Sequence, residues 1–162
     1  MKDKHQTINE LIKEKDFKSY LEIGFGNGFN FHRIAIESKI AIDPNSPQST
    51  DCMQIDSDSF FADNDLTFDL IFIDGDHTKE QAEKDMINSY NALNPGGVIL
   101  MHDVLPFTKE MQLVPKIQEQ WTGDVWRAFK GFSETYPKIK TEILPEKYGL
   151  GIIFKKRAKI DF

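Results

Sequence analysis

A glycine-rich segment directly after a short apolar run carries the clearest chemical signal in this chain. Residues 20–28 read Tyr-Leu-Glu-Ile-Gly-Phe-Gly-Asn-Gly, with glycine at positions 24, 26 and 28 and a carboxylate at Glu22. Glycine tolerates positive φ and leaves the backbone bare, so that a ligand can lie directly against it. A helix opening after the loop would add free N–H groups. The segment therefore predicts a loop that holds a flat or anionic ligand at the carboxyl edge of a sheet.

The spacing of the glycines argues against a dinucleotide-binding loop. That fingerprint would place its third glycine at position 29, where this chain has Phe29. The observed pattern is Glu-x-Gly-x-Gly-x-Gly, which disfavours a nicotinamide-dependent oxidoreductase. A plain turn between a strand and a helix would also use glycine, so the rest of the chain must decide between the two interpretations.

Polar residues also lie at or just beyond the end of each of the first five predicted strands. They are Glu22, Asp43, Asp56 with Ser57, Asp74 with Asp76 and His77, and His102 with Asp103. In an open α/β sheet the carboxyl ends of the strands line one crevice, where ligands bind. A single carboxylate after a strand is usually a helix cap, but capping alone does not explain five successive cases.

The elements that must position these residues alternate between strands and helices. The predicted strands cover residues 19–23, 39–42, 52–55, 68–73, 98–101, 140–144 and 150–154, and the predicted helices cover 6–15, 29–37, 79–93, 108–121 and about 124–132. Thr7 and Glu10 have capping-box spacing at the first helix, and Thr78 precedes the long one. The short connection between the last two strands requires them to be antiparallel.

This order predicts a single α/β domain over residues 1–162. Its sheet is expected to be doubly wound and seven-stranded, with six parallel strands and an antiparallel last strand. A sheet of this kind has helices on both faces and its ligand crevice at one edge.

The motifs resemble those of the class I methyltransferases that use S-adenosylmethionine (SAM). The glycine pattern is similar to motif I of that group. Residues 72–77 (Phe-Ile-Asp-Gly-Asp-His) and 93–104 (Leu-Asn-Pro-Gly-Gly-Val-Ile-Leu-Met-His-Asp-Val) are similar to small members whose fourth strand ends in Asp-Gly-x-His. These are related to sugar and natural-product O-methyltransferases. The resemblance extends over about residues 18–156, and Gly149-Leu-Gly-Ile-Ile matches the final strand.

The resemblance implies a Rossmann-like fold, SAM as cofactor, and methyl transfer to a hydroxyl of a sugar or small metabolite. The cofactor-binding residues that it implies are Glu22, Gly24, Gly26, Gly28, Asp43, Asp56, Ser57 and Asp74. Asp43 would accept hydrogen bonds from both ribose hydroxyls, and Asp56 would accept one from the adenine amine. Glu22 and the loop backbone would meet the amino acid end of the cofactor.

Two interpretations of the reaction centre stay open. Catechol-type relatives bind a divalent metal, and the corresponding ligands here would be Asp74, His102 and Asp103. Those relatives carry Asp-Asn or Glu-Asp where this chain has His-Asp, and a histidine ligand favours Mn²⁺ or a softer metal over Mg²⁺. Without a metal, Asp74 would orient the cofactor and His77 or His102 would be the catalytic base. His77 could alternatively cap the following helix.

The composition narrows the range of possible binding partners and cellular locations. The formal net charge of −6 disfavours nucleic acid, and the basic residues Lys155, Lys156, Arg157 and Lys159 are interpreted as a solvated tail. No apolar run approaches the ~20 residues of a membrane span, and no signal peptide is visible. A single cysteine, Cys52, fits a reducing compartment, so we expect a cytoplasmic protein without a membrane partner.

The acceptor is expected to be a small molecule or a sugar. The short segment before the first strand leaves a bare core, so the acceptor is large, enclosed by a second copy in a homo-oligomer, or bound in an open groove. Candidate groove residues are Phe107, Trp121, Trp126 and Phe129, which could equally belong to the core. A competing function is a binding module of the same fold that acts as a partner subunit, and cofactor binding without turnover would identify it.

Overall fold

The computed structural model describes residues 2–157 of the chain. The helices are α1 (Lys4–Lys15), α2 (Ser57–Asp63), α3 (Lys79–Ala92) and α4 (Val125–Thr135), with single 3₁₀ turns η1 (Phe31–Arg33) and η2 (Glu110–Gln112). The strands are β1 (Ser19–Ile23), β2 (Ser38–Ile42), β3 (Cys52–Met53), β4 (Phe68–Ile73), β5 (Leu93–His102), β6 (Thr141–Leu144) and β7 (Leu150–Phe154). In the part of the chain that the structure describes, no helix is long and apolar enough to cross a membrane.

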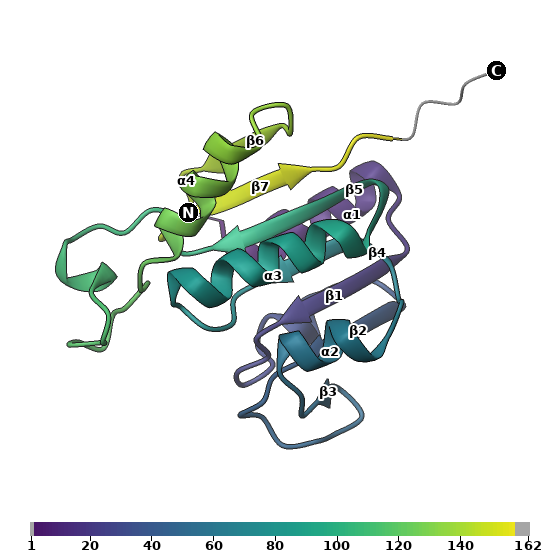
Figure 1. Ribbon diagram of the computed structural model, residues 1–162. Helices are drawn as coiled ribbons and strands as arrows, with labels where there is room; N and C mark the ends of the chain where they lie inside the picture. The colour runs from purple at the N-terminus through teal and green to yellow at the C-terminus, as the bar shows by residue number, and fades with distance from the viewer. Residues whose placement is uncertain (1, 158–162) are drawn as a thin grey trace.

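All seven strands form one sheet in the order β3-β2-β1-β4-β5-β7-β6 (Figure 1). The pairs β3–β2, β2–β1, β1–β4 and β4–β5 are parallel, whereas β7 is antiparallel to both β5 and β6. Six strands therefore share one direction and the last strand is reversed. This confirms the predicted fold class, including the terminal hairpin that separates it from an ordinary dinucleotide-binding sheet.

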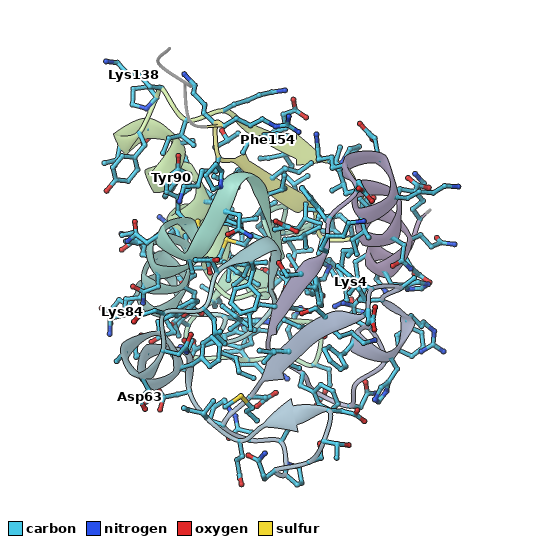
Figure 2. The ribbon with its side chains drawn as sticks, turned by 90° about the vertical axis from the view of Figure 1, so that its right-hand side faces the viewer. Lys4, Asp63, Lys84, Tyr90, Lys138 and Phe154 are labelled. Carbon is cyan, nitrogen blue, oxygen red and sulfur yellow. The ribbon has the colours of Figure 1, made fainter. Side chains whose placement is uncertain are left out.

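The alternation of side chains along β4 explains why both faces of the sheet are covered. Leu70 and Phe72 point into a cluster with Ile8 and Ile12 of α1. Their neighbours Ile71 and Ile73 point into the opposite cluster, which contains residues of α2, α3 and α4. Figure 2 shows the sheet between α1 on one side and α2 with α3 on the other. Because successive strand residues face opposite ways, a nearly continuous apolar strand needs helices on both faces.

The loop between β1 and β2 does not form the helix predicted over residues 29–37. Only the 3₁₀ turn Phe31–Arg33 is present, and the chain is extended at Ile34. Asn9 of α1 donates to Arg33 O and accepts from Ala35 N, and Lys39 Nζ donates to Phe31 O and Ile34 O. The helix prediction was wrong because these long-range side chains satisfy the backbone groups that a helix would have paired internally.

The helix predicted over residues 108–121 is also absent apart from the turn Glu110–Gln112. Pro115 lies in the middle of that range, has no N–H to donate, and disfavours helical geometry at Val114. The segment instead folds onto itself, with Trp121 Nε1 donating to Leu113 O at 2.6 Å. The aromatic residue thus ends a compact loop.

Two element boundaries and one additional helix also differ from prediction. Helix α1 begins two residues early, with Asp3 as its N-cap and Gln6 Oε1 accepting from Asp3 N, whereas the Thr7 hydroxyl donates to Glu146. Helix α2 was not predicted at all. Strand β5 begins at Leu93 rather than 98, because a register shift between Phe68 and Leu70 accommodates the Asn-Pro-Gly-Gly segment.

The basic cluster after β7 is not simply a solvated tail. Lys155 Nζ donates to Tyr90 O and Leu93 O at the end of α3, at 2.9 and 2.8 Å. Burial at this position lowers the pKa of Lys155. A lysine at a helix C-terminus satisfies free carbonyls and interacts favourably with the helix dipole. Lys159 lies outside the described residues.

Candidate active site

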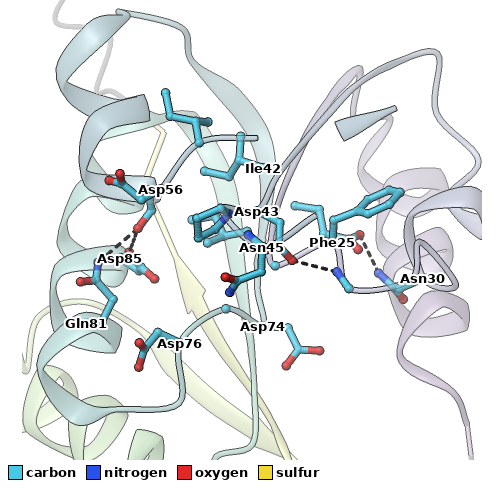
Figure 3. A pocket seen from close by; sticks show the side chains of 18 of the residues that line it. Phe25, Asn30, Ile42, Asp43, Asn45, Asp56, Asp74, Asp76, Gln81 and Asp85 are labelled. Atoms are coloured by element: carbon cyan, nitrogen blue, oxygen red, sulfur yellow. Dashed lines mark hydrogen bonds between the residues drawn. The ribbon is translucent and has the colours of Figure 1, made fainter. Parts of the chain in front are cut away.

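A cavity of about 610 Å³ opens at the carboxyl ends of β1, β2 and β4 (Figure 3). The loop after β1, the ends of β2 and β4, and the first turns of α2 and α3 form its walls. All the residues predicted to bind the cofactor line it except Gly28, namely Glu22, Gly24, Gly26, Asp43, Asp56, Ser57 and Asp74. The topology thus brings residues from four separate strand ends to one site, as the pattern of polar strand ends predicted.

The glycine loop has the geometry that its sequence requires. Gly24, Gly26 and Gly28 have φ values of 94°, 56° and 77°, in the region that favours glycine. A Cβ on Gly24 would lie 2.0 Å from Asp74 O, so the loop and the end of β4 meet backbone to backbone. A Cβ on Gly26 would meet nothing within 4 Å. Gly26 therefore presents bare backbone to the cavity, which fits a ligand lying against the loop.

Asp43 is held in place by this loop. Its Oδ2 accepts from Gly26 N at 3.0 Å and its Oδ1 accepts from Asn45 N at 2.8 Å. Partial desolvation would raise the pKa of Asp43, but these N–H groups hold the pKa below its usual value. The carboxylate is therefore ionised and oriented, with lone pairs left to accept further hydrogen bonds from a diol.

Glu22 differs from Asp43 because it is almost fully buried. Its Oε2 accepts from the Tyr20 hydroxyl and from Asn30 Nδ2, the latter at 2.8 Å. Burial outweighs these hydrogen bonds and raises the pKa of Glu22 from 4.5 to about 7. Asn30, which sequence reasoning missed, follows the loop by only two residues and is itself buried.

Asp56 and Ser57 serve α2 as well as the cavity. Asp56 is the N-cap, accepting from Ser59 N at 2.8 Å and from the Ser59 hydroxyl at 2.9 Å. The Ser57 hydroxyl donates to the buried Asp85 at 2.5 Å, and Gln81 Nε2 donates to both. Helix capping therefore accounts for the position of Asp56, while its exposed carboxylate still faces the cavity.

A second cluster lies beside the cavity, where β4 and β5 end. His102 Nδ1 is 3.2 Å from Asp103 Oδ1 and 3.5 Å from Asp74 Oδ1. His77 Nε2 is 3.3 Å from Asp103 Oδ2 and 3.5 Å from the same Asp74 oxygen. The two carboxylates and two imidazoles predicted as the reaction centre therefore converge on one point. His77 takes part in this cluster rather than capping α3.

The mutual contacts set the protonation of this cluster. Burial alone would lower the pKa of His102, but hydrogen bonds to Asp103 and Asp74 raise it to about 9. The pKa of His77 is raised by Asp74 and Asp103, also against the effect of burial. Burial opposes ionisation of Asp74, but His102, His77 and Lys4 hold its pKa well below the usual value. At neutral pH the cluster therefore holds ionised Asp74 beside a protonated His102, and the raised pKa of His77 favours its protonated form as well.

The same cluster has the donor set of a metal site. One ligand atom each from Asp74, His102 and Asp103 lie within 4.8 Å of one another. One nitrogen and two oxygens suit Mn²⁺ better than Mg²⁺, which prefers oxygen alone. His102 would have to lose its proton to bind a metal, so metal binding and protonation compete at Nδ1.

Two further residues of the site, Lys4 and Tyr148, gave no clear signal in the sequence, whereas Trp121 was a candidate groove residue. Lys4, the first residue of α1, contacts Asp74, and Trp121 stacks on His77 with ring centroids 5.3 Å apart. Tyr148, at φ 64°, packs edge-on against His102 at 6.3 Å and against Phe107 at 5.1 Å. Lys4 and Tyr148 come from segments distant in sequence from the motifs, so spacing alone could not have found them.

The predicted aromatic groove is split in two. Trp121 stacks on His77 of the reaction centre, whereas Phe107 packs on Tyr148 beside it and is 63% exposed. Phe129 is buried in the core beneath Gly151, which was the alternative interpretation. Trp126 lines, together with Phe129, a second cavity of about 500 Å³ between α4 and β6. The prediction of one groove was therefore wrong, because α4 directs its apolar face into the sheet.

Comparison with known proteins agrees with this arrangement. A reversed last strand, a glycine loop after β1 and acidic strand ends define the class I methyltransferase fold. The model of a family described as methyltransferase domain matches residues 21–104, and the chain belongs to that family. A search among curated proteins gives no match.

Solved structures of methyltransferases share the fold at low sequence identity. An O-methyltransferase from Bacillus cereus, solved with S-adenosylhomocysteine (SAH), is 16% identical with a TM-score of 0.66, covering 94% of this chain and 80% of that one. An SAH-bound methyltransferase from Podospora anserina is 18% identical with a TM-score of 0.65 and coverage of 98% and 80%. The O-methyltransferase TomG from Streptomyces achromogenes, solved with SAM, is 12% identical with a TM-score of 0.66 and coverage of 94% and 79%.

Proposed function

We propose that this protein transfers the methyl group of SAM to a hydroxyl of a sugar or small metabolite. The family assignment and the SAM- and SAH-bound structures of similar fold support SAM as the cofactor. Two of those structures are of O-methyltransferases, which supports a hydroxyl acceptor. The cavity has the bare loop and the oriented carboxylate that a nucleoside with an amino acid arm would need.

One observation carries the proposal: Asp74 belongs to both parts of the site. It lines the cavity together with the glycine loop, and it contacts both His77 and His102 of the reaction centre. A cofactor in the cavity would therefore place its reactive end beside groups that can handle a proton. Holding acceptor and methyl donor in line in this way contributes much of the rate of a displacement reaction.

Different residues of the cavity would bind different parts of the cofactor. Asp43 accepts from the ribose hydroxyls, Asp56 and Ser57 lie at the adenine end, and Glu22 lies toward the amino acid end. SAM supplies an electrophilic methyl group, so the acceptor oxygen forms the new bond as the bond from sulfur to methyl breaks. The acceptor hydroxyl must lose its proton to a group of the reaction centre.

Two routes for that proton are compatible with the cluster. Asp74, His102 and Asp103 could hold a divalent metal that lowers the pKa of the acceptor hydroxyl. Without a metal, His77 or His102 takes the proton, and only the neutral imidazole can do so. Because the pKa of His102 is raised to about 9, activity by that route should increase as the pH rises toward 9.

Calorimetric titration with SAH tests the cofactor assignment. Asp43→Ala removes the acceptor for the ribose hydroxyls, so the binding free energy should weaken by about 1.5–3 kcal/mol, as for hydrogen bonds to a charged group. Asp63→Ala, an exposed carboxylate at the end of α2, is the matched control and should bind as the wild type does. Unchanged affinity in Asp43→Ala would show that the cofactor lies elsewhere.

Turnover with a panel of sugar and small hydroxyl acceptors tests the reaction itself. EDTA should abolish methyl transfer if a metal activates the acceptor and leave it intact if a histidine is the base. Activity that survives both EDTA and alanine at each histidine would eliminate both routes. SAH binding without turnover on any acceptor would favour a partner subunit of the same fold.

A further inference from the structure

The first residue of α1 brings a positive charge into an otherwise acidic cavity. Among the described residues, Lys4 is the only lysine or arginine that lines it. The acidic side chains around it are Glu22, Asp43, Asp56, Asp58, Asp74, Asp76 and Asp85. Such a cavity attracts cations and repels anions, unless a local cation compensates. A ligand with a carboxylate therefore has one place in the cavity where that group is favoured.

Contacts made by the first two turns of α1 hold Lys4 in this position. Its Nζ contacts Asp74 Oδ2 and lies 5.4 Å from the centroid of the Phe72 ring. Thr7 ties the helix to Glu146 of the terminal hairpin, and Asn9 ties it to the loop after β1. Figure 2 shows Lys4 between α1 and the sheet. The side chain is 29% exposed and lines the cavity, so its ammonium group is accessible to a ligand there.

The order of residues along the cavity places Lys4 at the end opposite to the proposed adenine position. In Figure 3, Asp43 lies between Asp56 on one side and Asn30 on the other. If Asp56 marks the adenine and Asp43 the ribose, the remaining end is the one beside Asn30 and Glu22. Lys4 lies at this end too, because it contacts Asp74, whose backbone meets Gly24.

We propose that Lys4 binds the carboxylate of the methionine moiety of SAM. The inference rests on the proposed function and deepens it by assigning the amino acid end of the cofactor. A lysine ammonium has three donors, so Lys4 can keep Asp74 while donating to the cofactor carboxylate. Without that cation, Asp74 and the cofactor carboxylate would repel each other across the reaction centre. Lys4 thus links cofactor binding to the carboxylate that contacts both histidines.

Calorimetry with two related ligands tests this assignment. The probes are SAH and decarboxylated SAH, which keeps the adenosine, the thioether and the amine but lacks the carboxylate. Lys4→Met keeps an unbranched side chain of similar length and removes the charge. SAH should bind roughly 10- to 100-fold more weakly to this variant than to the wild type, the range for a hydrogen bond to a charged group. Decarboxylated SAH should bind both proteins within about twofold, since it makes no such bond.

Two further variants complete the design. Lys13→Met, an exposed lysine on the same helix, should leave both affinities unchanged. Lys4→Arg restores a cation and should recover part of the SAH affinity. Equal weakening of both ligands in Lys4→Met would show that α1 acts on the shape of the cavity, and unchanged SAH affinity would show that Lys4 does not touch the ligand. Either result overturns the inference. Wild-type protein that binds neither ligand would overturn the proposed function itself.

Discussion

Replacing Glu22 by glutamine tests how the buried carboxyl next to the glycine loop is stabilised. Glu22 is only 1% exposed, and it accepts hydrogen bonds from Tyr20 and Asn30. Burial raises its pKa from 4.5 to about 7. Glutamine keeps the size of the side chain and an oxygen that can accept both bonds, but it does not titrate.

The sign of the effect follows from the direction of the pKa shift. Below pH 4.5 Glu22 is protonated in both the folded and the unfolded chain, so its contribution to the unfolding free energy is at its maximum. Between 4.5 and about 7 the unfolded chain loses its proton first, and stability falls as the pH rises. Above pH 7 the loss is complete and amounts to about 3 kcal/mol, at about 1.36 kcal/mol per pH unit.

Urea unfolding of the wild type and of Glu22→Gln, followed by tryptophan fluorescence between pH 4.5 and 8, measures the pH-dependent contribution of Glu22 to stability. Other ionisable groups titrate alike in the two proteins, so the difference between their unfolding free energies isolates Glu22. Any fixed cost of the glutamine amide is the same at every pH. We expect the variant to gain about 3 kcal/mol relative to the wild type across this range. A difference that stays constant with pH would refute the reasoning, because it would mean that Glu22 is ionised in the folded protein.

Two other predictions concern the loop and the reaction centre. Gly24→Ala should lower the unfolding free energy by more than about 2 kcal/mol, because the methyl group would lie 2.0 Å from Asp74 O at a φ of 94°. Gly131→Ala in α4 is the control and should raise the unfolding free energy by about 0.5–1 kcal/mol, because alanine is favoured over glycine in a helix and the new Cβ would meet only Glu83, at 3.9 Å. A similar loss of stability in both variants would contradict the prediction for Gly24. Mn²⁺ should raise the melting temperature of the wild type but not of Asp103→Ala, which removes the ligand oxygen, and no change in either would exclude a metal bound by this cluster.

The sequence by itself determined the class of fold and most of the cofactor cavity. The apolar run of β4 and the short connection before β7 are local patterns, and they fixed a parallel sheet with a reversed last strand. The grouping of the polar strand-end residues into one site followed from this fold, since parallel strands present their carboxyl ends at one edge of the sheet. Asp43 and Asp74 could therefore be assigned to one site before any distance was known.

The tertiary structure decided what depends on contacts between distant segments. The helix expected after the glycine loop does not form, because Asn9 and Lys39 hydrogen-bond the backbone groups of that segment. Contacts of this kind cannot be predicted from local helix propensity. Lys4 reaches Asp74 across 70 residues of chain, and only the packing of α1 on the sheet makes that contact. The raised pKa of His102 likewise comes from Asp74 and Asp103 acting together in a buried site. Spacing places residues at an edge of the sheet, but protonation and charge pairing depend on distances of a few ångströms that only the folded chain sets.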